Sequence, residues 1–171
     1  MRIRVIAYSI LIFLTVLIQS TLTDFIKIYD VKPNLTIAVI VCVAFRRNTI
    51  EGAIVGFFCG LIQDAVSGRV IGFYALLGLY LGVIIGKSNK KLNKENALIA
   101  IFLTFVSTIV YEYVVYFFTT VFRAPLDFIY PFKNIILTEA IYNSVISIIA
   151  FIIVNRIHKK IERYEKNSRR Y

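Results

Sequence analysis

Apolar residues along this chain come in long blocks that short charged connectors separate. A helix of a soluble protein keeps a polar face at helical periodicity, and most of these blocks have none. The pattern predicts membrane-spanning helices over residues 5–22, 33–45, 50–65, 70–86, 97–122 and 135–154. The expected fold class is all-α: a polytopic membrane protein with a six-transmembrane-helix bundle in residues 1–155 and a basic cytoplasmic tail in residues 156–171.

Composition agrees with this class, because 58% of the 171 residues are hydrophobic and the mean hydropathy is +0.75. The longest polar stretch is the segment 155–171, which leaves no room for a separate catalytic module. The run 5–22 follows two arginines, as the apolar region of a signal peptide does. It is longer than a typical signal region and lacks a clear small-x-small cleavage site, so we expect it to be a retained first span.

The second expected helix is short. At about 1.5 Å per residue it covers about 20 Å of a hydrocarbon core about 30 Å thick. It must therefore thin the bilayer, tilt little or be shielded by neighbouring helices. Arg46 and Arg47 force a break after it, since two adjacent arginines do not sit in mid-bilayer. Asn48 and Glu51 resemble a capping box at the start of the third helix.

Positive charge is distributed unevenly between the two sides of the membrane. With six spans and the N-terminus inside, 15 of the 20 lysines and arginines fall in cytoplasmic segments. The positive-inside rule therefore predicts that both termini are cytoplasmic. The net charge of +10 lies beside apolar blocks and on the tail, without a basic groove-binding domain. We expect it to face the lipid bilayer, and we expect no nucleic-acid partner.

Glycines recur four residues apart in two of the expected helices, as Gly52, Gly56 and Gly60 in one and as Gly78 and Gly82 in the other. Small residues at this spacing allow two helix backbones to approach closely. These positions are candidates for a partner or packing interface. The two glycine faces either pack against each other, which is the favoured interpretation, or one of them receives a partner protein's helix.

Asp64 follows the first glycine series, ahead of Gly68 and Gly72 in the connecting turn. A carboxylate at this place can bond the free N–H groups at the start of the next helix, or it can pair with Arg69. Either contact would satisfy it locally. We therefore expect a structural role rather than ligand binding, and we group Asp64, Gly68 and Gly72 with the candidate interface.

Glu112 lies well inside the fifth expected helix, where an ionised carboxylate is costly unless it is paired, protonated or exposed to water. It is therefore expected to point into the bundle, with Glu139 and Asn143 of the sixth helix as neighbours. Buried acids of this kind mark proton or substrate pathways in transporters. A hydrogen-bonded acid with a purely structural role is an equal alternative.

Catalytic patterns do not occur in the sequence. The single histidine, His158, lies in the basic tail, and no Ser/His/Asp, Cys/His or paired-carboxylate arrangement shares an external face. Cys42 and Cys59 have neither disulfide nor metal spacing and are interpreted as small packing residues. We therefore expect no enzyme activity, no cofactor and no metal site.

An ordered series of motifs runs through residues 33–86. It comprises Pro33-Asn34-Leu35, the glycines named above, Gly60-Leu61-Ile62-Gln63-Asp64, Ser67-Gly68, Gly72 followed by Ala75-Leu76, and Tyr80-Leu81 before Gly82. This series resembles the MreD family of bacterial rod shape-determining membrane proteins. Asn34 departs from the family pattern, because an acid is expected more often at that position.

The resemblance implies a non-enzymatic component of the cell-elongation machinery in the bacterial cytoplasmic (inner) membrane. It implies MreC as the direct partner, through the transmembrane helix and juxtamembrane segment of MreC. It implies MreB, RodA and a class B penicillin-binding protein as indirect partners in peptidoglycan synthesis.

The family is also similar in architecture to the substrate-binding subunits of energy-coupling-factor vitamin transporters. Such a vitamin-binding subunit is the alternative function. It fits less well, because residues 5–22 offer only Ala7 followed by Leu11 where an Ala-x-x-x-Ala face is expected. An enzyme acting on a lipid-linked substrate is least favoured, since the outer loops supply few acids and bases.

Overall fold

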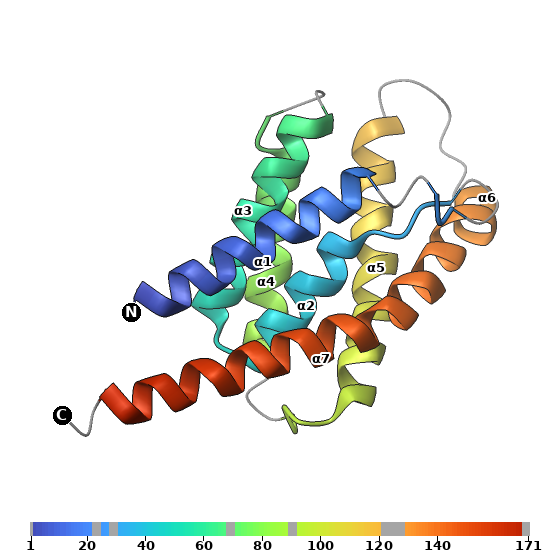
Figure 1. Ribbon diagram of the computed structural model, residues 1–171. Helices are drawn as coiled ribbons and strands as arrows, with labels where there is room; N and C mark the ends of the chain where they lie inside the picture. The colour runs from blue at the N-terminus through green and yellow to red at the C-terminus, as the bar shows by residue number, and fades with distance from the viewer. Residues whose placement is uncertain are drawn as a thin grey trace.

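Successive helices run in alternating directions through the bundle (Figure 1). The computed structural model describes residues 2–21, 25–27, 31–67, 71–88, 92–120 and 129–168. Its elements are α1 (Arg2–Thr21), α2 (Leu35–Arg46), α3 (Thr49–Ser67), α4 (Phe73–Ser88), α5 (Ala97–Thr120), the short α6 (Ile129–Pro131), the π-helical turn η2 (Phe132–Ile136) and α7 (Leu137–Ser168). The described residues form helices and no strand, which confirms the all-α fold class.

Four helical segments of the described chain are long and apolar enough to cross a membrane, namely Ile3–Thr21, Thr49–Val66, Ala97–Thr120 and Ile129–Tyr164. The apolar helices α2 and α4 are shorter, with 12 and 16 residues. These helices confirm a polytopic membrane protein. Helix α7 continues to Ser168, beyond the expected span 135–154, so the basic tail extends the last helix. The division into a membrane domain, 1–155, and a tail, 156–171, stays a prediction.

The short helix α2 forms the centre of the bundle. Every residue from Thr36 to Arg46 is buried, and the side chains of Ile37, Ile40 and Phe45 are fully enclosed. Helices α1, α3, α4, α5 and α7 all contact α2. Of the three ways to accommodate a short span, the structure uses shielding by neighbouring helices. Because α2 touches little else than protein, its length does not have to match the bilayer.

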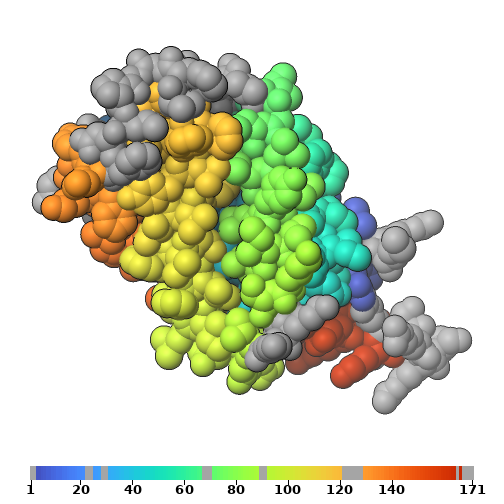
Figure 2. All heavy atoms as spheres, turned by 180° about the vertical axis from the view of Figure 1, so that it is seen from behind, coloured from blue at the N-terminus to red at the C-terminus, as the bar shows by residue number. Residues whose placement is uncertain are grey.

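Helices α1 and α7 lie on one side of α2, and α4 and α5 lie on the other (Figure 1). Figure 2 shows the α4–α5 side, where green α4 and yellow α5 form one continuous face. Helix α1 has the smallest buried share of the four long apolar segments. Large apolar side chains such as Val5, Ile6 and Phe13 are more than half exposed on it. In a membrane these side chains face lipid or another protein.

Candidate functional site

The backbones of α3 and α4 touch along their glycines. We call the contact of Gly52, Gly56 and Gly60 with Gly78 and Gly82 the glycine seam. A Cβ atom added at Gly56 would collide with the carbonyl of Gly78, and one added at Gly82 would collide with the carbonyl of Gly52. Gly60 meets the backbone of Tyr74 in the same way. No side chain larger than hydrogen fits at these positions without moving a helix.

The glycine seam is closed by α3 and α4 themselves. At Gly56, Gly60, Gly78 and Gly82 an added Cβ would meet backbone of the facing helix, and at Gly52 it would first meet Ala44 of α2, so helices of this chain already fill the seam. Of the two alternatives for the glycines, the structure therefore places them in internal packing. This is the packing that the glycine spacing favoured, and a partner role for these glycines stays a prediction.

The carboxylate of Asp64, at the end of α3, caps the start of α4. Asp64 is 1% exposed and accepts backbone hydrogen bonds from Gly72 at 2.9 Å, Tyr74 at 2.9 Å and Ala75 at 3.0 Å. Gly72 has a φ of 100°, which favours glycine, and its carbonyl accepts the N–H of Leu76. Asp64 thus supplies the acceptor that an N-cap side chain would otherwise supply. Gly68 and Arg69 lie outside the described residues.

A second polar group, the Asn34 cluster, joins α2, α5 and α7 inside the bundle. It consists of Asn34, Thr108, Glu112, Glu139 and Asn143. The backbone N–H of Asn34 donates to Asn143 Oδ1 at 2.7 Å, and its side-chain amide donates to Glu112 Oε1 at 3.5 Å. Asn143 Nδ2 donates to Thr108 Oγ1 at 3.2 Å. Glu139 of α7 is 7% exposed and lies beside Glu112 in this cluster.

The Asn34 cluster satisfies the start of a helix that begins inside the protein. The Asn34 side chain accepts the N–H of Ile37 at 3.4 Å as the N-cap of α2. Gln19 of α1 accepts the N–H of Leu35 at 2.7 Å and donates to the carbonyl of Pro33 at 3.0 Å. Backbone N–H and C=O groups away from water need such partners, because leaving one without a hydrogen bond costs on the order of several kcal/mol.

The structure brings Glu112, Glu139 and Asn143 together, as the sequence suggested, but it centres them on a residue that sequence reasoning missed. Asn34 and Gln19 were not singled out as site residues. A signal for both exists, because Pro33-Asn34 opens a helix too short to reach both membrane surfaces. The free N–H groups of such a helix must find acceptors on neighbouring helices.

At the opposite end of α2, the charged cluster of Arg4, Tyr8, Arg47 and Glu51 joins α1 to the α2–α3 connector. The Glu51 carboxylate lies 3.3 Å from Arg4 and 3.4 Å from Arg47, and it accepts a hydrogen bond from the Tyr8 hydroxyl at 3.0 Å. Arg47 Nε also donates to the Tyr8 oxygen at 3.0 Å. Glu51 therefore directs both oxygens to α1 and Arg47 rather than to a capping box with Asn48.

The basic connectors meet at this same end of the bundle. Lys94 donates to the carbonyl of Arg47 at 3.0 Å, and the Arg46 guanidinium donates to the carbonyl of Lys94 at 3.5 Å. Arg46 also lies 3.7 Å from the Glu95 carboxylate. The break after Arg46 thus occurs as expected, and the segments before α3 and before α5 share one side with the start of α1.

These polar groups hold helices in register. Within the described ranges, no three His, Cys, Asp or Glu side chains could hold one metal ion. Cys42 and Cys59 are free and fully buried. Each contact of Asp64, of the Asn34 cluster and of the charged cluster joins one part of the chain to another, so their chemistry is that of a framework.

The comparisons with other proteins agree with this picture. No curated protein and no solved structure matches the chain, and the architectural likeness to vitamin-transporter subunits stays a prediction. The family described as rod shape-determining protein MreD matches residues 1–161, from the start of α1 into the basic part of α7. The match extends well beyond the motifs at residues 33–86. The chain therefore belongs to the MreD family of rod shape-determining membrane proteins.

Proposed function

We propose that this protein is a non-enzymatic scaffold of the cell-elongation machinery in the bacterial cytoplasmic membrane. It docks the transmembrane helix and juxtamembrane segment of MreC. Through MreC it links the MreB filament to RodA and a class B penicillin-binding protein, which synthesise peptidoglycan. The family match over residues 1–161 carries this proposal, and it favours rod shape determination over vitamin binding.

The contacts inside the bundle support a scaffold. Glu112 accepts a hydrogen bond from the Asn34 side-chain amide and lies beside Glu139, contacts that fit the structural alternative for these buried acids. The charged cluster and the Asp64 cap likewise connect helices. A bundle held at its centre and at both ends presents its outer faces in a fixed arrangement, as a docking protein requires.

MreC docks on an outer face, since the glycine seam is filled. Each of the helices α1, α3, α4, α5 and α7, which surround α2, exposes large apolar side chains that a transmembrane helix could cover. Representative exposed positions are Phe13 on α1, Phe58 on α3, Tyr80 on α4, Phe102 on α5 and Ile149 on α7.

The proposed orientation places both termini in the cytoplasm, with the membrane crossed by residues 1–155 and the tail at 156–171. Its support is the positive-inside asymmetry together with the meeting of Arg4, Arg46, Arg47 and Lys94 at one end of the bundle. That end would face the MreB filament.

A photocrosslinking scan in living cells tests the docking. A photoreactive phenylalanine derivative replaces, one at a time, each of the five representative residues, and adducts with MreC are detected by immunoblotting. Cells depleted of MreC serve as the control. Adducts confined to one or two adjacent helices support docking and locate it. If all five membrane-inserted variants fail to form an MreC adduct, direct docking is wrong.

A further inference from the structure

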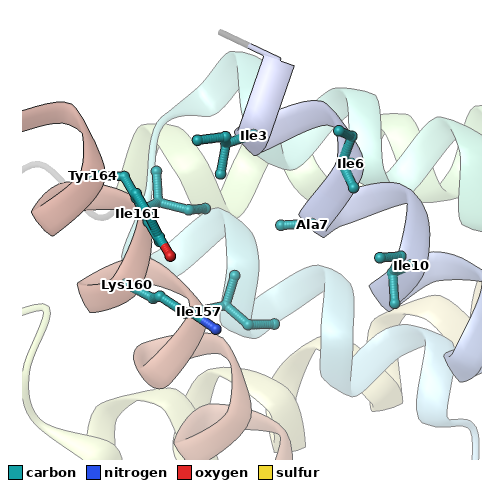
Figure 3. A pocket seen from close by; sticks show the side chains of 8 residues that line it. All are labelled: Ile3, Ile6, Ala7, Ile10, Ile157, Lys160, Ile161 and Tyr164. Carbon is teal, nitrogen blue, oxygen red and sulfur yellow. The ribbon is translucent and has the colours of Figure 1, made fainter. Parts of the chain in front are cut away.

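A groove between α1 and α7 is unused by the framework contacts. Ile3, Ile6, Ala7 and Ile10 of α1 line it on one side, and Ile157 and Lys160 are among its lining residues on α7. Its volume is about 510 Å³. Figure 3 shows these side chains facing one another from the two helices across the gap. The groove lies at the end of the bundle that holds both chain termini (Figure 1).

Charge is arranged asymmetrically around α7 beside this groove. The groove residues of α7 lie three or four positions apart and so share one helix face; they are Ile157, Lys160, Ile161 and Tyr164. An exposed basic stripe follows one edge of that face, consisting of Arg156, Lys159, Lys160, Arg163 and Lys166. On the other side of the helix, Glu162 lies 3.3 Å from His158. Among the carboxylates whose side chains the structure describes, none forms an ion pair with the basic stripe. Lys160 belongs to both the stripe and the groove.

We infer that the α1–α7 groove binds an anionic phospholipid, with an acyl chain between the isoleucines and the headgroup against Lys160 and the basic stripe. The volume lies in the range of ligand sites, about 300–1,000 Å³, and the walls are apolar as an acyl chain requires. Basic residues next to a membrane-spanning helix attract anionic lipids. The charge at the mouth of the groove therefore favours an anionic lipid over a neutral one at this position.

A lipid suits this groove better than a partner's helix does. Small residues on the contact face favour close packing of transmembrane helices. Ala7 is the one small side chain that lines the groove, and branched isoleucines surround it. An acyl chain can thread between such side chains, whereas a helix about 10–12 Å across would rest on top of them.

Lipid retention by the purified full-length protein tests the inference. The protein in mild detergent is mixed with equal amounts of dioleoyl phosphatidylglycerol and dioleoyl phosphatidylethanolamine, and retained lipid is measured by native mass spectrometry. We expect phosphatidylglycerol to be retained preferentially. Lys160→Gln should lower this retention about fivefold and leave retention of phosphatidylethanolamine unchanged. Lys166→Gln is the matched control, because it removes a charge from the same stripe outside the groove and should change retention less than about twofold.

Two outcomes of this experiment would overturn the inference: no preference for phosphatidylglycerol, or an equal loss in both variants. The second outcome would mean that diffuse surface charge, rather than the groove, selects the lipid. Both substituted side chains are exposed, so neither change should affect folding.

A photoreactive residue at Ile6 gives an independent measurement of what fills the groove in cells. An adduct with the mass of a phospholipid supports the inference. An adduct with a polypeptide, whether a second copy of this chain or another protein, would assign the groove to protein docking and contradict it. Failure to form any adduct would equally contradict lipid occupancy.

Discussion

Gly56→Ala probes the glycine seam most directly, because it adds one methyl group where α3 and α4 touch. Helix propensity alone favours alanine by about 1 kcal/mol. Against this, the new Cβ would overlap the carbonyl oxygen of Gly78 and lie 2.6 Å from its carbonyl carbon. These are backbone atoms that cannot rotate away, so α4 must shift, and the cost lies in the upper part of the range for overpacking, at about 2–3 kcal/mol. Displacing α4 also separates Gly52 from Gly82 along the same seam.

We therefore expect a net destabilisation of about 1–2 kcal/mol for Gly56→Ala, and a larger one for Gly56→Leu. Cys42 and Cys59 are free and fully buried, so a thiol-reactive fluorophore reports unfolding on heating without any added label site. At about 2–4 °C per kcal/mol for a chain of this size, the midpoint should fall by about 2–8 °C.

Ile54→Ala is the matched control on the same helix, since Ile54 is 51% exposed. Its midpoint should change by less than about 1 °C, in line with small effects of surface substitutions. A Gly56→Ala midpoint equal to or above that of the unsubstituted protein would refute the backbone contact, because helix propensity would then act unopposed.

Further substitutions test three other contacts. Asp64→Ala should lower the midpoint of thermal unfolding more than Asp64→Asn does. In the alanine variant the N–H groups at the start of α4 lose their acceptor, at a cost of about 1–3 kcal/mol each. Equal midpoints for Asp64→Ala and the unsubstituted protein would exclude the cap. Glu51→Gln should cost about 1.5–3 kcal/mol, since it leaves buried Arg47 without its carboxylate. Glu95→Gln, at a carboxylate 76% exposed, should cost less than about 0.5 kcal/mol, and an equal loss in both would contradict the charged cluster. Asn143→Ala should speed hydrogen exchange at residues 34–38 by removing the acceptor of the Asn34 N–H, whereas unchanged exchange there would show that Asn143 does not fix the start of α2.

Much of the fold follows from sequence because the bilayer imposes simple rules. Long apolar blocks must be helices that satisfy their own backbone, and Arg46-Arg47 must end one of them. Glycines four apart indicated close helix contact, and the structure shows which helix fills the contact, with α4 against α3. The acid Glu112, placed deep in an apolar helix, required polar neighbours, and it meets Glu139 and Asn34.

Features that depend on packing between distant segments could not be read from local pattern. Helix α2 is buried on all sides because five other helices surround it. The hydrophobic pattern within its own 12 residues does not predict this burial. The capping box expected from Asn48 and Glu51 was wrong because Glu51 is bound by Arg4 and Tyr8, more than 40 positions away in sequence. The burial of Ile161, which lies among charged residues in the last part of α7, likewise depends on packing against other helices.

Capture of MreC by the tagged full-length protein tests the scaffold role most directly. Membranes containing both proteins are solubilised in mild detergent, and the amount of MreC that is retained is compared with retention by an unrelated, equally tagged multi-helix membrane protein. The scaffold account predicts that MreC is retained well above this control. Retention of MreC no higher than in the control would contradict it.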